Sequence, residues 1–313
     1  MRRRWWLLRL GATAAALGLW WWLARASAGD LLGALGRISP RAIVVALALS
    51  FLALWVGALR WQALLRVYGA VTVPPLGLLL RAYLEGVFFN TFLPANVGGD
   101  VLRAHVTRKA FPGVAGAYLI VAIERVFGLA ALCLLASAML LVHPIAGLEA
   151  GPWLAAVGSL VAVGAAASPV LARRASRRLP GRLGELTRLA PQVRRPELLI
   201  LVLTLSLGTQ TLVALTGHAL VASLEPAVTV ADSLVRVPAA LATTYFPTIA
   251  GLGAREAAFV VLFRGAGVSQ ADATAASLAF LGVQLVVALV GGVVHVWPGT
   301  REPLPAAPNG PTS

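Results

Sequence analysis

The sequence predicts an all-α, polytopic membrane protein: a helical bundle with about six full spans and two re-entrant helical hairpins in an inverted repeat. Three observations lead to this fold class. Of the 313 residues, 59% are hydrophobic and 12% are charged, which leaves too few polar side chains to cover a soluble fold. Apolar stretches long enough to cross a bilayer recur along the chain. Two further apolar stretches contain charges, prolines and glycines, which a lipid-exposed helix would not carry.

The spans are predicted from length and hydrophobicity, because a helix needs about 20 apolar residues to cross the hydrocarbon core. Tryptophans near several span ends fit the interfacial belts of membrane proteins. We treat residues 1–297 as one membrane domain and residues 298–313, rich in proline, as a flexible tail. The six predicted spans are 5–24, 42–61, 115–142, 153–171, 197–221 and 273–297.

The first span has two interpretations. Three arginines precede it and Ala26-Ser27-Ala28 follow it, a pattern that is typical of a cleavable signal peptide. The apolar run of about 20 residues is longer than the usual signal core of about 7 to 15. Its length favours an anchor that stays in the membrane.

The distribution of arginine sets the orientation, because cytoplasmic loops are enriched in Lys and Arg. Residues 172–196 hold eight arginines, so we place this loop and the N-terminus in the cytoplasm. Residues 143–152 hold no Arg or Lys and are expected outside. By the same count Arg60, Arg66 and residues 103–109 are expected in the cytoplasm.

This orientation is possible only if residues 76–98 enter and leave the membrane by the same face, as a re-entrant hairpin. Residues 223–233 contain no Arg or Lys and are expected outside. Residues 235–264 then form a second hairpin that opens to the opposite side, and the C-terminus is cytoplasmic. The two halves, 42–142 and 197–297, thus form an inverted repeat. Inverted repeats with interrupted helices are typical of transporters.

The first predicted break lies in the stretch FFNTFLPANVGGDVLRAHVTRK, residues 88–109. Irregular backbone at membrane depth must line a cavity or pack inside protein. Consecutive amides in such a turn can hold an anion, Arg103 would add a guanidinium that matches a phosphate, and Asp100 would cap the next helix and orient Arg103. The alternative is a tight turn with a capped helix at the cytoplasmic interface. The candidate binding residues here are Asn90, Asn96, Gly98, Gly99, Asp100 and Arg103.

Glu124 and Arg125 are further candidates, because they lie well inside the predicted span 115–142. A charge near the bilayer centre costs about 2.5 to 3.5 kcal/mol on insertion scales, so ionisable groups there are functional hypotheses by default. Neighbouring residues on a helix point about 100° apart, so each of the two needs a partner on another segment. A purely structural ion network is the alternative. The expected partners are Arg81, Glu85, Arg255 and Glu256.

The second predicted break lies in YFPTIAGLGAREAAF, residues 245–259, where Gly251 and Gly253 permit a turn. Arg255 and Glu256 then begin a helix. Arginine in a first helical turn is unfavourable unless an anion or a carboxylate compensates it. We therefore predict Arg255 as a ligand of a head-group phosphate and Glu256 as its neighbour in the site.

Other classes of site are not expected. The basic excess of 26 Lys or Arg over 12 Asp or Glu lies between apolar spans, so we expect no nucleic-acid partner. The single cysteine, Cys133, lies in an apolar run, and the histidines share no metal-ligand spacing. We expect no metal and no cofactor.

Four motifs occur in order along the chain: LRWQALL at 59–65, NTFLPANVGGDVLRA at 90–104, ERVFGL at 124–129 and FPTIAGLGAREAAF at 246–259. They resemble the lysylphosphatidylglycerol synthase transmembrane region, or flippase-like, family of prokaryotic membrane proteins. Members include the membrane half of two-part proteins that attach lysine to phosphatidylglycerol and move the product across the bilayer. The resemblance implies the translocation half without the soluble aminoacyltransferase domain.

Together these features predict a flippase or scramblase of the prokaryotic cytoplasmic membrane for an anionic or aminoacylated (glyco)phospholipid. The carboxylates Asp100, Glu124 and Glu256 would keep the arginines from trapping the head group. The arginines expected to hold phosphate are Arg103, Arg125 and Arg255.

Two other functions remain open at this stage. One is an integral-membrane transferase in which Asp100 or Glu124 is the base. The other is a subunit that presents a phospholipid or a polyprenyl-linked lipid to a separate lipid-modifying or cell-envelope enzyme.

Overall fold

The computed structural model describes residues 28–92, 98–111, 114–143, 156–164, 191–243 and 254–297, with the single residues 18, 153 and 174. In this part of the chain all regular structure is helical. It comprises ten helices with defined bounds and the helical residues 156–164. The ten are α2 (Ala28–Arg37), α3 (Pro40–Val67), α4 (Leu76–Phe92), α5 (Gly98–Val106), the short 3-10 helix η2 (Arg108–Ala110), α6 (Val114–Val142), α9 (Leu198–Ala222), α10 (Val230–Ala242), α11 (Ala254–Arg264) and α12 (Gln270–Val296).

Among the described residues, four helices are long and apolar enough to cross a membrane: α3, α6, α9 and α12. Their ends follow local rules, since Ser39 and Ser269 cap α3 and α12 and Pro40 occupies the first turn of α3. They correspond to the predicted spans 42–61, 115–142, 197–221 and 273–297. The predicted spans 5–24 and 153–171 lie largely outside the described residues.

The α3 helix continues past the predicted span end to Val67. Arg60 and Arg66 therefore belong to this helix and not to a loop. The Arg66 side chain is exposed, whereas Arg60 is 6% exposed. Arg60 lies at the end of the predicted span 42–61, and its guanidinium is buried with the Glu124 carboxylate as partner.

Each predicted hairpin region is a pair of contacting helices, α4 with α5 and α10 with α11. In the first pair, α5 extends from Gly98 to Val106 and contains Arg103. The helix pair therefore extends beyond residue 98, where the predicted hairpin ended. The breaks at 93–97 and 244–253 lie outside the described residues. Three predicted site residues, Asn96, Gly251 and Gly253, fall there.

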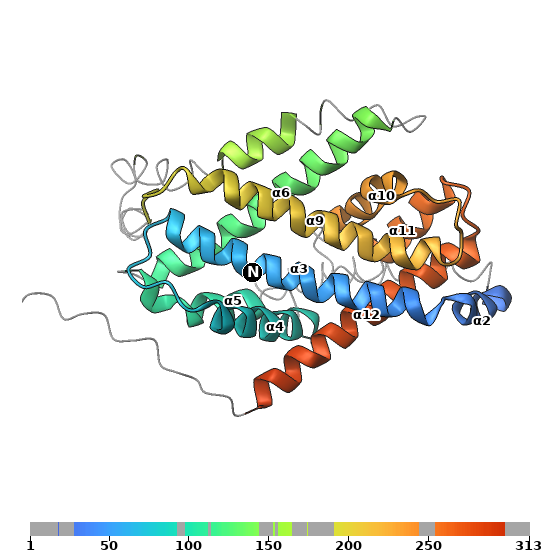
Figure 1. Cartoon of the computed structure of the whole chain (residues 1–313), viewed down its shortest axis with the longest axis horizontal. Helices are drawn as coiled ribbons and strands as arrows, with labels where there is room; N and C mark the ends of the chain where they lie inside the picture. Colours follow the sequence, from blue (N-terminus) through green and yellow to red (C-terminus); the bar gives the residue numbers. More distant parts are fainter. Residues whose placement is uncertain are drawn as a thin grey trace, which may run out of the picture.

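The two helix pairs lie at opposite ends of the molecule (Figure 1). α3 and α9 run side by side along its length and make the largest contact between any two described helices. At one end, Val67 O accepts a hydrogen bond from Arg194 N at 2.7 Å and Ala110 O accepts one from Val71 N at 2.8 Å. We call this the Val67 end; α4 begins and α5 finishes there.

The opposite end is the Arg37 end, where the Arg37 guanidinium pairs with Asp272 at 2.5 Å. α10 begins and α11 finishes at this end (Figure 1). The hydrophobic core follows the same division. One buried cluster surrounds Trp61 and Leu79 of the first half, and another surrounds Phe263 of the second half.

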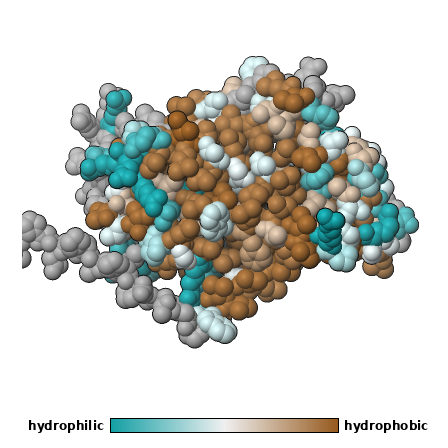
Figure 2. All heavy atoms as spheres, in the orientation of Figure 1, coloured by the Kyte–Doolittle hydropathy of each residue, from teal (hydrophilic) through white to brown (hydrophobic). Residues whose placement is uncertain are grey.

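The outer surface is apolar between the two ends. Figure 2 shows a broad hydrophobic region in the middle of the molecule, with hydrophilic residues towards the left and right ends. Large apolar side chains are exposed on this surface, among them Ile200 at 76% and Val293 at 63%. Such a surface is stable in acyl chains and not in water.

Glycines allow α4 to lie directly against two neighbouring helices. A Cβ atom on Gly99 of α5 would collide with the backbone of Gly86 in α4, and one on Gly291 of α12 would collide with the Leu84 carbonyl. Small residues at such contacts let membrane helices approach closely. The position of α4 therefore depends on glycine on both sides.

We expect Gly99→Ala to lower the stability of the protein by about 1 to 3 kcal/mol, because overpacking forces the backbones of α4 and α5 apart. The measurement is thermal unfolding of the purified protein in detergent. Gly77→Ala is the matched control, since a Cβ atom at Gly77 meets nothing within 4 Å. A Gly99→Ala melting temperature equal to that of the control contradicts the close packing.

Candidate functional site

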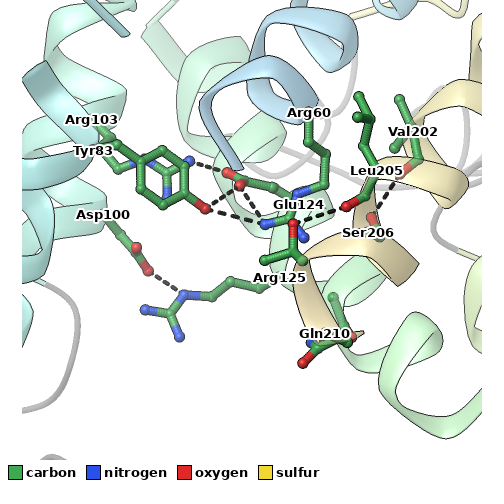
Figure 3. Close-up of polar contacts among 12 residues, drawn as sticks. Arg60, Tyr83, Asp100, Arg103, Glu124, Arg125, Val202, Leu205, Ser206 and Gln210 are labelled. Carbon is green, nitrogen blue, oxygen red and sulfur yellow. Dashed lines mark hydrogen bonds and ion pairs between the residues drawn. The ribbon is translucent and has the colours of Figure 1, made fainter. Parts of the chain in front are cut away.

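Glu124 lies near the middle of α6 and is 1% exposed. Its Oε1 atom accepts hydrogen bonds from Arg60 Nη2 at 2.7 Å and from the Tyr83 hydroxyl at 2.8 Å. Its Oε2 atom forms an ion pair with Arg103 Nη2. Arg60, Tyr83 and Arg103 come from α3, α4 and α5, and converge on the carboxylate in Figure 3. We call these four residues the Glu124 cluster; they join four helices.

Aromatic rings complete the surroundings of Arg103. Its guanidinium carbon lies 4.1 Å from the centroid of the Tyr83 ring and 4.5 Å from that of Trp61, which is the geometry of a cation–π contact. The Tyr83 ring packs against Gly57, where an added Cβ atom on Gly57 would lie 3.0 Å from the ring. Arg103 is thus held by a carboxylate and by two aromatic rings.

The burial of these charges decides their role. Removing one partner from a buried ion pair leaves an uncompensated charge, which is far costlier than the pair itself. Arg60 and Arg103 are each 6% exposed, so neither has water as an alternative partner. The Glu124 cluster therefore holds the α4–α5 pair against α3 and α6.

A second ion pair lies beside the cluster. Arg125 Nε pairs with Asp100 Oδ2, which joins α6 to the first turn of α5. The Arg125 side chain is 43% exposed, in contrast to the buried side chain of Glu124. At the start of α5, Asn90 Oδ1 accepts a hydrogen bond from Gly99 N at 2.8 Å.

These residues surround a cavity of about 320 Å³. Glu124, Gly128 and Leu132 contribute the middle of α6, and residues 209–213 contribute the middle of α9. The Gln210 amide donates to Gly128 O at 2.9 Å across this contact. The described residues of the lining are Arg60, Tyr83, Asn90, Asp100, Arg103, Glu124, Arg125, Gly128, Leu132, Thr209, Gln210, Val213 and Leu241.

The structure thus brings five predicted site residues to one cavity. Gly99 and Gly98 shape the adjoining helix start and are not part of the described lining. Asp100 pairs with Arg125, whereas the sequence suggested that it would orient Arg103. The five that line the cavity are Asn90, Asp100, Arg103, Glu124 and Arg125.

The predicted residues of the second break lie elsewhere. Arg255 pairs with Glu256 through its Nε at 2.9 Å, and its guanidinium carbon lies 5.6 Å from the centroid of the Phe280 ring. A carboxylate therefore does compensate the arginine in the first turn of α11. The described cavity lining includes Leu241 of α10 but neither Arg255 nor Glu256.

The expected partners of Glu124 are wrong. Arg81 pairs with Glu85 at 2.9 Å at the contact between α4 and α12, and Glu85 also lies 3.4 Å from His295 Nδ1. The arginine count had used Arg60 only as a marker of the cytoplasmic side, so it was not recognised as a partner of Glu124. Its position inside the LRWQALL motif was the available signal. Tyr83 carried no signal in the sequence.

Another polar group lies at the Arg37 end. Thr229 caps α10 with Asp232 in a reciprocal capping box, and Asp232 pairs with Arg236 at 3.2 Å. Burial alone would raise the pKa of Asp232, but the hydrogen bonds from Thr229 and the charges of Arg236 and His143 hold that pKa below its usual value. In the described part of the chain, no three His, Cys, Asp or Glu side chains are grouped to hold a metal ion.

Glu124→Gln removes the charge that both buried arginines share. We expect a loss of about 3 to 5 kcal/mol in stability, the range for breaking a buried ion pair from one side. Thermal unfolding in detergent measures it. Glu197→Gln is the control, because Glu197 is exposed at the start of α9 and makes no side-chain capping bond. Equal melting temperatures for the two variants contradict the structural role of the cluster.

Comparison with known proteins agrees with this architecture. No protein of curated function matches the chain. The sequence profile of one family, described as the lysylphosphatidylglycerol synthase TM region, matches residues 6–292. The match spans most of the chain and includes every helix that contributes to the cavity. The chain therefore belongs to the lysylphosphatidylglycerol synthase TM region family, and it is a multi-pass membrane protein of lipid-related function.

Proposed function

We propose that the protein translocates or scrambles an anionic or aminoacylated (glyco)phospholipid across the prokaryotic cytoplasmic membrane. The observation that carries the proposal is the cavity itself, which lies at the middle of α6 and α9 and is lined by three arginines and two carboxylates. Charged side chains at this depth are costly and mark the paths of polar substrates. The lipid tails would stay in the bilayer while the head group passes through the cavity.

The arginines have different roles in this proposal. Arg103 was expected to hold phosphate, but Glu124 and two aromatic rings already engage it. Arg125 is partly exposed and pairs with Asp100. A guanidinium binds phosphate and carboxylate with the same fork geometry, so a head-group phosphate would replace Asp100 on Arg125. Asp100 would then recover Arg125 and release the lipid.

The arrangement of the helices supports two opposed hairpins. The second-half helices α9, α10, α11 and α12 begin at residues 198, 230, 254 and 270, which follow the starts of α3, α4, α5 and α6 at 40, 76, 98 and 114 by 158, 154, 156 and 156 residues. The α4–α5 pair and the α10–α11 pair lie in opposite halves of the molecule (Figure 1), which supports hairpins that open to opposite ends. This is the organisation that transporters with inverted repeats use for alternating access.

Charge supports an orientation for the proposed path. The Val67 end carries Arg66, Arg108, Lys109, Arg194 and Arg195. We assign this end to the cytoplasm under the positive-inside rule. The cavity would then be reached from the inner leaflet beside α4 and α5.

The geometry favours binding over a transferase reaction. Both candidate bases, Asp100 and Glu124, are ion-paired with arginines, and Glu124 also accepts a hydrogen bond from Tyr83. A carboxylate held in this way must first give up an arginine partner before it can take a proton from a substrate. A lipid-presenting role uses the same cavity and is distinguished by the transport assay below.

We expect Arg125→Ala to slow translocation by roughly 10- to 100-fold, the effect of losing one charge-assisted hydrogen bond of about 1.5 to 3 kcal/mol. The measurement uses purified protein in liposomes with phosphatidylglycerol that carries a fluorescent acyl chain, quenched from outside. Arg66→Ala is the control, since Arg66 is exposed on α3. Arg255→Ala should have a smaller effect than Arg125→Ala. Wild-type rates for Arg125→Ala contradict the role of Arg125, and inactive wild-type protein favours the presenting role.

Cysteine accessibility tests both hairpins and the orientation. In a Cys133→Ala background, Val71→Cys and Lys109→Cys flank the first hairpin, and Val230→Cys and Arg264→Cys flank the second. We expect a membrane-impermeant maleimide to label only the second pair in intact cells and the first pair after permeabilisation. Opposite behaviour of two cysteines within one pair shows a segment that crosses the membrane.

A further inference from the structure

The charges of the cavity do not cancel. Its described lining contains three arginines, Arg60, Arg103 and Arg125, against two carboxylates, Asp100 and Glu124, which leaves one positive charge. The breaks that adjoin the helix pairs, residues 93–97 and 244–253, contain no Asp, Glu, Lys or Arg. They therefore add nothing to this charge.

The hydrogen bonds show the same excess. Each guanidinium offers five N–H groups, whereas Glu124 offers two oxygens, and both are in use. Arg60 Nε and Arg103 Nε are buried and make no hydrogen bond. The cluster thus has more donors than acceptors and more positive than negative charge, and an anionic ligand in the cavity would balance the charge.

We propose that the cavity selects a head group of net charge −1, that is, a lipid phosphodiester without a compensating amine. This inference rests on the proposed function and narrows its substrate class. A single negative charge neutralises the lining, and an uncompensated charge at membrane depth is unfavourable. A zwitterionic head group leaves the surplus in place, and an aminoacylated one adds an ammonium to it.

The cavity volume suits the head group alone. At about 320 Å³ it lies at the lower end of ligand pockets, which range over roughly 300 to 1,000 Å³. A phosphodiester with a small polyol fits this space, and the acyl chains remain outside it. Neutral acceptors and donors in the lining, such as Thr209 and Gln210, would contact the hydroxyl groups.

Asn90 offers a way to change the charge without changing the shape. Its Oδ1 atom accepts the hydrogen bond from Gly99 N, and an aspartate has the same oxygen in the same place. Asn90→Asp therefore adds one negative charge to the lining and brings its sum to zero. Asp100→Asn has the opposite effect and raises the sum to +2.

Binding to the purified full chain in detergent at low salt tests the proposal, with dihexanoyl phosphatidylglycerol and dihexanoyl phosphatidylethanolamine as probes. We expect wild type to bind the glycerol lipid at least about tenfold more tightly, the scale of one charge interaction in a partly shielded site. Asn90→Asp should abolish this preference and Asp100→Asn should increase it. Gln270→Glu at the start of α12 adds the same charge away from the cavity and should leave the preference intact.

Equal affinity of wild type for the two lipids overturns the proposal, and so does an unchanged preference in Asn90→Asp. If Asn90→Asp does not fold, Arg125→Gln removes the surplus by another route and should also lose the preference. The liposome assay separates this proposal from the proposed function. A binding preference without translocation refutes only the proposed translocation. Translocation of both lipids at one rate, with equal affinity, refutes only the selection for a head group of net charge −1.

Discussion

The structure depends on one constraint: a carboxylate can stay ionised inside a membrane only if cations reach it. Glu124 meets this constraint with two arginines from different helices and the hydroxyl of Tyr83. Arg60 and Arg103 depend on the contact as well, because an unpaired buried guanidinium is unfavourable just as an unpaired buried carboxylate is. The result is a junction of four helices whose partners are specified by charge and hydrogen bonding, which apolar packing alone would not do.

The junction also explains why the charged residues of the described cavity lining all come from the first half of the protein. Phe280 is the eleventh residue of α12, as Glu124 is the eleventh residue of α6. Where the first half gathers arginines around a carboxylate, the second half packs Phe259, Phe263 and Phe280 together, with Arg255 over the last ring. The two halves have the same order of helices. Among the described residues, however, the ion pairs around Glu124 in the first half have no counterpart around Phe280 in the second half. The first half supplies the charged residues of the described cavity lining, and the second half supplies Thr209, Gln210, Val213 and Leu241.

Much of the fold was predictable, because length and hydrophobicity directly determine which helices cross a membrane. Four predicted spans coincide with long apolar helices, and Glu124 and Arg125, which the cost of a charge in lipid singled out, both line the cavity. The partners were not predictable by the same reasoning. Arg60 and Arg103 stand near predicted segment ends, where the arginine count used them only to place the cytoplasmic side, and only the three-dimensional arrangement shows that both face Glu124. The pairing of Arg255 with its neighbour Glu256 shows that a long side chain can reach the adjacent residue on a helix, although the two side chains leave the helix about 100° apart.

Glu124 and Arg125 are consecutive in α6, so one backbone carries both a fully engaged charge and a half-exposed one. Any displacement of α6 that separated Arg125 from Asp100 would also separate Glu124 from Arg60 and Arg103. The helix is therefore an unsuitable moving part. In the proposed transport, the head group would therefore pass by rotation of the Arg125 side chain while α6 stays in place, and other rearrangements would be confined to segments that the Glu124 cluster does not hold.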